Sequence, residues 1–222
     1  MARVIAFDIN ETTLSLDALA PGFERAFGTA DLVPLWFALL LQSSTVAVLT
    51  RVSVTFAELG AAALDNLAAR RGITLGGDDR QAILGQFQNL TPHPHVAPNL
   101  QRLREAGLTT VALSNSSGQL LAGQLGNAGL AELFDHVISV ETIGYFKPAP
   151  QVYQVAAERL GVAPVDLCLI AAHDWDTHGA LRAGCQAAYV QRSPVPYNPH
   201  YDRPAIVGGD MNQVVDALLA QQ

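Results

Sequence analysis

Lysine is nearly absent from this sequence: Lys147 is the only lysine among 13 basic residues. Charged residues of all kinds make up only 15% of the 222 residues, while half of the residues are hydrophobic. Such a composition supports a large packed core and excludes an intrinsically disordered chain. The net charge of −7, with no basic cluster, argues against nucleic acids and anionic membrane surfaces as partners.

Cysteine is also scarce, with only Cys168, inside an apolar run, and Cys185. Two thiols, with no signal-peptide pattern before them, exclude the disulfide framework of a small secreted protein. We therefore expect a cytoplasmic protein whose cysteines stay reduced.

One long stretch, between Asp31 and Arg51, contains no charge at all. Pro34 and the polar residues 42–45 interrupt it, whereas a membrane-spanning helix needs about 20 predominantly apolar residues. The stretch therefore predicts a buried helix, which could also face a partner subunit, and no contact with a membrane.

The apolar pattern predicts a helical block followed by alternating helices and strands. Between Asp17 and Pro94 we expect four helices, at 18–27, 34–49, 56–71 and 78–90, and no convincing strand. From Asn99 onward the alternation is typical of parallel βαβ units with helices on both faces of the sheet. Strands are expected at 109–113, 136–139, 167–171 and 187–190, and helices at 99–106, 118–128, 150–160, 176–183 and from 211.

The apolar run 4–7 reads as a further buried strand of that sheet, so the helical block is an insertion after it. Asp8 follows the run directly and would lie in the crevice where open α/β sheets bind ligands. Taken alone, Asp8 is better explained as the cap of the next turn. Polar residues at three further strand ends favour a site: Ser114 to Ser117, then Lys147, then His173 to Asp176.

That order resembles the haloacid dehalogenase superfamily, whose four motifs are a nucleophilic Asp, a Ser or Thr, a Lys and an acidic loop. Asp8, Ser114, Lys147 and Asp176 occupy those places. The resemblance covers essentially the whole chain and implies an α/β fold with a Rossmann-like core, its parallel sheet flanked by helices, plus an inserted helical cap. Residues 1–16 and 95–222 would form the core domain, and residues 17–94 the cap.

Most members of that superfamily are Mg²⁺-dependent phosphatases whose first motif resembles Asp-x-Asp. Here the second Asp is replaced by Asn10, and the position of a further metal-binding Asp is Ala172. Because Mg²⁺ is held through carboxylates and water, we expect no metal and no other cofactor. A residual phosphatase activity is the weaker alternative.

The closer resemblance is to the L-2-haloacid dehalogenase branch, which uses no metal. The matching segments are Leu-Ser-Asn-Ser-Ser at 113–117, Phe-Lys-Pro-x3-Val-Tyr at 146–153, and Trp175-Asp176. The resemblance implies that Asp8 attacks the α-carbon of a short 2-haloacid and expels halide. Water would then hydrolyse the resulting aspartyl ester, so that one difficult step is split into two.

The resemblance also implies roles for the neighbouring residues. Lys147 would keep Asp8 ionised through its opposite charge, and Thr12 would orient the carboxylate. Asp176 would handle the hydrolytic water together with Lys147. The substrate carboxylate would be held by a hydroxyl and two backbone amides, those of Ser114, Ile9 and Asn10.

The chain departs from the branch where the leaving group should be received. The branch carries a halide-binding arginine after a Trp, but Trp36 is followed by Phe37. Halide stabilisation would then fall to Asn115, to His173, to the ring edges of Phe37, Phe56 and Trp175, or to another arginine that the sequence does not place. Phe37, Leu41 and Phe56 are most simply the interior of the cap, whereas the resemblance implies that they line an apolar pocket between cap and core.

His173 replaces an Asn of the group that handles water, and it is either a general base or a neutral hydrogen-bonding group. Asn10 also replaces a Tyr near the nucleophile, which predicts a more polar pocket.

Two further readings stay open. One keeps the nucleophile but changes the leaving group to a strained ring or another small activated acid. The other is a non-catalytic scaffold that dimerises through helix 34–49, although the retained Asp8, Lys147 and Asp176 argue against it. As an enzyme the protein would need only a haloacid and water, and it could form a homodimer through its cap helices.

Overall fold

A six-stranded parallel sheet forms the centre of the computed structural model, which describes residues 2–221. The strand order is β5-β4-β1-β6-β7-β8. The strands are β1 (Val4–Phe7), β4 (Thr109–Ser114), β5 (His136–Ser139), β6 (Leu167–Ala171), β7 (Gln186–Val190) and β8 (Ile206–Gly208). The predicted parallel α/β sheet is confirmed.

Strand β1 lies in the interior of the sheet, paired with β4 on one side and β6 on the other. Ile5 and Phe7 face one hydrophobic cluster, whereas Val4 and Ala6 face a second one. A strand buried on both faces is apolar at every position, which explains why this run shows no alternation. Asp8 consequently emerges between the carboxyl ends of two neighbouring strands.

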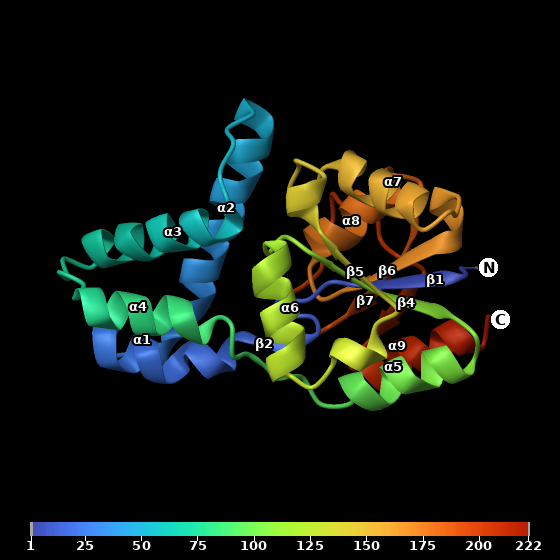
Figure 1. Ribbon diagram of the computed structural model, residues 1–222, viewed down its shortest axis with the longest axis horizontal. Coiled ribbons are helices and arrows are strands. Elements are labelled where there is room, and N and C mark those ends of the chain that lie inside the picture. Colours follow the sequence, from blue (N-terminus) through green and yellow to red (C-terminus); the bar gives the residue numbers. More distant parts are fainter. Residues whose placement is uncertain (1, 222) are drawn as a thin grey trace.

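Helices cover both faces of the sheet (Figure 1). Helices α5 (Val96–Glu105) and α9 (Met211–Leu219) pack on one face, and α7 (Pro150–Arg159) and α8 (Asp174–Arg182) on the other. Helix α6 (Gly118–Asn127) packs beside β5. The predicted helices are therefore confirmed, with ends that differ by a few residues.

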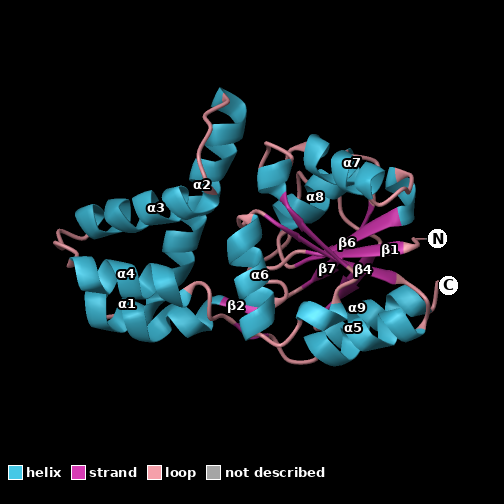
Figure 2. Ribbon diagram, viewed as in Figure 1, coloured by secondary structure: helices cyan, strands magenta, loops and turns pink. Residues whose placement is uncertain are grey.

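The helical block lies to one side of the sheet (Figure 2). It contains α1 (Ala20–Phe27), α2 (Val33–Thr50), α3 (Phe56–Arg70) and α4 (Gly77–Gln86). Trp36 is buried at its centre and donates its indole hydrogen to the carbonyl of Gly60 at 2.9 Å. Both connections to the sheet domain pass through a short antiparallel pair, β2 (Leu14–Ser15) and β3 (Thr91–Pro92).

Two sequence predictions about strands are wrong. Strand β3 lies in the block where no strand was expected, and β8 lies between the expected strand 187–190 and the expected helix from 211, where no further strand was predicted. These strands have two and three residues, which is too short for an alternating pattern to show. Pairing with β2 and with β7 defines them instead.

Helix α2 was expected to be buried, and this prediction is wrong for one of its faces. Trp36, Phe37 and Leu40 are buried, but Val46 is 51% exposed and Leu49 is 78% exposed. By length and composition alone, Ala30–Thr50 is apolar enough to cross a membrane, although core helices pass the same test. The buried aromatic face shows that α2 is part of the folded helical block.

Candidate active site

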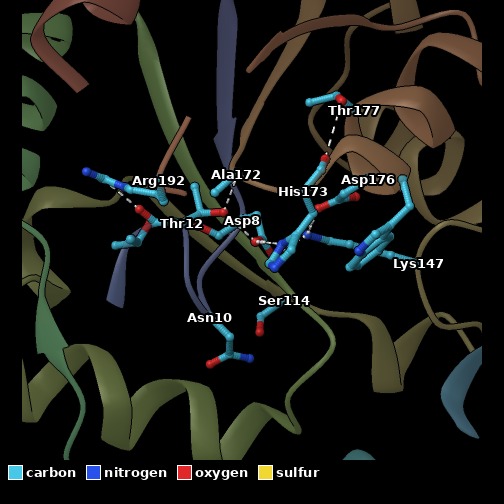
Figure 3. A network of polar contacts seen from close by, with 12 residues as sticks. Asp8, Asn10, Thr12, Ser114, Lys147, Ala172, His173, Asp176, Thr177 and Arg192 are labelled. Carbon is cyan, nitrogen blue, oxygen red and sulfur yellow. Dashed lines mark hydrogen bonds and ion pairs between the residues drawn. The ribbon is translucent and has the colours of Figure 1, made fainter. Parts of the chain in front are cut away.

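Three side chains surround the carboxylate of Asp8 at the edge of the sheet (Figure 3). The Lys147 ammonium donates to Oδ1 at 2.9 Å, and the Thr12 hydroxyl donates to Oδ2 at 2.6 Å. His173 places Nδ1 3.2 Å from the same Oδ2. Asp8 is only 6% exposed, so these contacts replace most of its hydration.

The turn after β1 is fixed to the end of β6. The Thr13 hydroxyl donates to the Asp8 carbonyl at 2.6 Å, and the Ala172 amide donates to the Thr12 hydroxyl at 2.8 Å. Glu11 adopts a left-handed backbone with φ of 65°, which allows the chain to reverse immediately after Asp8. Thr12 thus holds its orientation independently of a ligand.

Lys147 joins two carboxylates that come from different strand ends. Its ammonium lies 2.9 Å from both Asp8 and Asp176, and it is 1% exposed. The Lys147 amide donates to the side chain of Asn115 at 2.9 Å. Burial alone would lower the pKa of Lys147, but the two carboxylates outweigh it and raise that pKa. The lysine is therefore a fixed cation.

Asp176 receives a second buried partner, because the Tyr153 hydroxyl donates to its Oδ1. Gly179 permits this approach: a Cβ there would lie 2.8 Å from the Tyr153 hydroxyl and 2.6 Å from a carbon of Pro148. Tyr153 was noticed in the sequence only as part of a motif, and no role was assigned to it.

The charges stabilise one another. Burial would raise the pKa of Asp8, but Lys147 and His173 outweigh burial and hold it well below the usual range. Burial would lower the pKa of His173, but the contact with Asp8 outweighs burial and raises it. Asp8 is therefore an ionised, desolvated carboxylate, and its histidine partner favours the imidazolium form.

Aromatic rings fix the orientation of His173. Its imidazole stacks on Trp175, with ring centroids 5.1 Å apart and planes 27° apart, and contacts Phe37 of α2 at 5.9 Å. Position 37 is where the resemblance placed an arginine. The structure thus places a histidine from the sheet domain directly against position 37.

The side chain of Asn10 points away from Asp8 (Figure 3). It donates to Ser116 at 3.3 Å and accepts from Gln124 at 3.1 Å. The expected increase in pocket polarity therefore does not come from this amide. Ser114 lies nearby, 1% exposed, and accepts a hydrogen bond from the Ser116 amide at 3.1 Å.

The remaining predicted residues separate into two cavities between the helical block and the sheet domain. A cavity of about 580 Å³ is lined by Asn115, Phe56 and Phe146. A second cavity of about 400 Å³ is lined by His173, Phe37 and Leu41. Phe37, Leu41 and Phe56 therefore do not line one common pocket.

Arg192 was missed by the sequence analysis. It follows β7, and its Nη2 donates to the Thr12 carbonyl at 2.9 Å, while its Nε is buried without a hydrogen-bond partner among residues 2–221. Its position after the end of a fifth predicted strand could have identified it, because the other site residues were identified by following the ends of predicted strands. Arg192 therefore stabilises the turn that contains Thr12.

We expect Arg192→Met to lower kcat roughly tenfold with little change in KM, because one charged hydrogen bond positions Thr12 but does not touch a reacting atom. Arg203→Met removes an arginine that lies over Tyr197, and it serves as the matched control. Steady-state kinetics measure both variants. Equal kcat values in the two would show that Arg192 does not position the turn.

The chain is similar in sequence to a known protein family and to individual known proteins. Residues 2–184 match the haloacid dehalogenase-like hydrolase family model. (S)-2-haloacid dehalogenase 1 of Pseudomonas sp. (strain CBS-3) is 31% identical over 87% of this chain and 86% of its own. The (S)-2-haloacid dehalogenase of Xanthobacter autotrophicus is 31% identical over 86% of this chain and 76% of its own.

Solved structures of L-2-haloacid dehalogenases are also similar to this chain. The crystal structure of an L-2-haloacid dehalogenase is 28% identical, with a TM-score of 0.93 over 98% of each chain. A defluorinating L-2-haloacid dehalogenase is 27% identical, with a TM-score of 0.80 over 99% of this chain and 94% of its own. The chain therefore belongs to the haloacid dehalogenase-like hydrolase family, within its L-2-haloacid dehalogenase branch.

Proposed function

We propose that this protein is a metal-independent hydrolase that removes halide from short 2-haloacids, with Asp8 as the nucleophile. The observation that carries the proposal is the buried Asp8 carboxylate, which is kept ionised by Lys147 and oriented by Thr12. A desolvated, oriented carboxylate suits displacement at carbon. The names of the two sequence relatives, both (S)-2-haloacid dehalogenases, support the same substrate class.

The reaction has two steps. An oxygen of Asp8 forms a bond to the α-carbon, and the carbon–halogen bond breaks with its electron pair leaving as halide. Water then attacks the Asp8 carbonyl carbon, which frees the 2-hydroxyacid and restores the carboxylate. Asp176 and Lys147 hold the water beside the ester, and His173 is the candidate base.

The substrate carboxylate is received by Ser114 and by the backbone amides of Ile9 and Asn10. Other amides of the same turn, those of Glu11, Thr13 and Leu14, already donate to backbone carbonyl groups of the turn. The leaving halide is received by the side-chain nitrogen of Asn115. Within the described chain, the side-chain oxygen of Asn115 accepts a hydrogen bond from the backbone amide of Lys147, so the nitrogen stays available.

The residues present support metal independence. Positions 10 and 172, where the phosphatases of the superfamily carry carboxylates, hold Asn and Ala. Within residues 2–221, no group of three His, Cys, Asp or Glu side chains could hold a metal ion. The ammonium of Lys147 supplies the positive charge beside Asp8 instead.

Phe37 favours a second candidate, in which the leaving group is not a halide. Among the branch's halide-binding groups the cap arginine is missing, and the buried ring of Phe37 offers no charge. A strained ring or another small activated acid, opened by the same Asp8, needs less stabilisation of a free anion.

Halide release from purified protein decides between these candidates. L-2-chloropropionate, L-2-bromopropionate and fluoroacetate are supplied with and without EDTA. We expect chloride or bromide release that EDTA does not change. Activity that disappears with EDTA would indicate a phosphatase-like metal site, and an adduct on Asp8 without halide release would favour the second candidate.

The division into core and cap is part of the same proposal. Residues 1–16 and 95–222 carry the catalytic groups, and residues 17–94 close over them as the cap. The exposed apolar residues of α2, Leu35, Val46 and Leu49, support a homodimer formed through the cap helices.

A further inference from the structure

We propose that His173 holds a proton in the resting enzyme, releases it to solvent when Asp8 becomes an ester, and then accepts a proton from the hydrolytic water. This inference rests on the proposed function, because it requires an ester at Asp8. It assigns His173 a proton cycle that is set by the state of the nucleophile, and it goes beyond the choice between a base and a neutral hydrogen-bonding group.

The resting charges balance in pairs. Lys147 lies 2.9 Å from both Asp8 and Asp176, so one ammonium serves two carboxylates. The contact of His173 with Asp8, at 3.2 Å, supplies the second cation. With His173 protonated, two carboxylates and two cations cancel, whereas a neutral imidazole would leave a buried excess of negative charge.

The neighbours of His173 show which groups control its proton. Glu11, from the turn after β1, and Asp176, from α8, raise its pKa less than Asp8 does. Phe37 from α2 and Trp175 from α8 contact the ring and carry no charge. Asp8 is thus the dominant partner, and its charge decides whether the imidazolium is favoured.

Ester formation removes that charge. Asp8 donates an electron pair to the α-carbon, halide departs with the electrons of the carbon–halogen bond, and the carboxylate becomes a neutral ester. His173 loses its anionic partner but stays partly buried against the rings of Phe37 and Trp175, and this partial burial favours the neutral form. The proton then leaves for solvent.

A route for that proton is present at the ring. The cavity of about 400 Å³ is lined by His173 and also by Glu11, Asp17 and Asp31. Carboxylates along this opening can relay a proton outward. The described residues that line it do not include Asp8 or Lys147, so the route serves the histidine and not the nucleophile itself.

Neutral His173 is then correctly placed for the second step. Its Nδ1 lies next to the carboxyl group of Asp8, where water attacks the carbonyl carbon. Water gives one proton to His173 and its oxygen to Asp8, and the other proton passes to the departing alcohol oxygen. Asp8 regains its charge, which again stabilises the imidazolium.

The timing of proton release tests this cycle. In a single turnover with L-2-bromopropionate, a pH indicator follows protons while quenched samples give bromide and lactate. We expect one proton to appear with bromide and before lactate. A proton that appears only with lactate would overturn the proposal, whereas the absence of bromide release would instead contradict the proposed function.

Variants supply the matched controls. In His173→Asn, which restores the amide of the branch, the proton should appear with lactate. In His178→Gln, whose histidine lies near Asp202, the proton should still accompany bromide. Unchanged early release in His173→Asn would show that another group holds the proton.

A second measurement requires no turnover, so it tests the proposal even if the ester does not accumulate. Asp8→Asn resembles the ester in shape and lack of charge. Nuclear magnetic resonance titration should show the pKa of His173 falling by about one unit or more in this variant. A fall of less than roughly 0.3 units would contradict a proton held by Asp8.

Discussion

Replacing Asp8 by Asn should lower kcat for halide release by a factor on the order of 10⁶, the size of loss seen when a covalent nucleophile is removed. The amide has the shape of the carboxylate but lacks its charge, so it cannot form the ester bond. Lys147 keeps Asp176 as a partner, at 2.9 Å, and the fold should be retained. Steady-state halide release and circular dichroism measure the two effects.

The matched control is Asp216→Asn, which makes the same change on α9, where Asp216 pairs with Arg102 at the surface. It should keep full activity. Intact mass must show that the introduced amide has not been hydrolysed back to a carboxylate during purification. A verified Asp8→Asn enzyme with more than about one hundredth of the parent rate would remove Asp8 from its nucleophilic role.

Replacing Lys147 by Met should damage both catalysis and folding. Removing one partner from a buried ionic cluster costs about 3–5 kcal/mol of unfolding free energy, because the remaining carboxylates stay buried without their cation. Halide release should fall about 10³-fold, since Asp8 loses the charge that keeps it ionised. Urea unfolding and steady-state kinetics measure these losses, and Arg102→Met, at an exposed ion pair, should cost under about 1 kcal/mol.

Lys147→Met should also change how the stability of the protein depends on pH. In the parent, the pKa of Asp8 is depressed below 3.8, so its contribution to stability is present above that value and is lost only as the pH falls through the folded pKa. Without Lys147, only His173 and Thr12 still oppose the effect of burial, so the pKa of Asp8 rises from its depressed value. Stability of the variant should therefore decline at a higher pH than in the parent, and identical acid unfolding curves would contradict the role of Lys147.

Most of the site was predictable because the rule that brings it together is geometric. The carboxyl ends of parallel strands share one edge of a sheet, so Asp8, Ser114 and Asp176 could be placed together from the order of strands alone. Lys147 was identifiable by its rarity. The structure adds that its ammonium contacts both carboxylates and that Tyr153 completes the cluster.

Other features depend on contacts that no local pattern records. Strands β2, β3 and β8 exist through pairing, and their two or three residues carry no periodic signal. The exposed face of α2 depends on how the helical block packs. Likewise, the raised pKa of His173 comes mainly from its contact with Asp8, which sequence spacing cannot predict.

Isotope transfer in a single turnover tests the central claim most directly. Excess enzyme reacts with L-2-bromopropionate in ¹⁸O-labelled water, and mass spectrometry examines both the product and the peptide that contains Asp8. If Asp8 forms an ester, its own oxygen leaves in lactate, and one ¹⁸O atom appears in Asp8. Label in lactate, with none in the Asp8 peptide, would contradict the account by showing that water attacks the substrate directly.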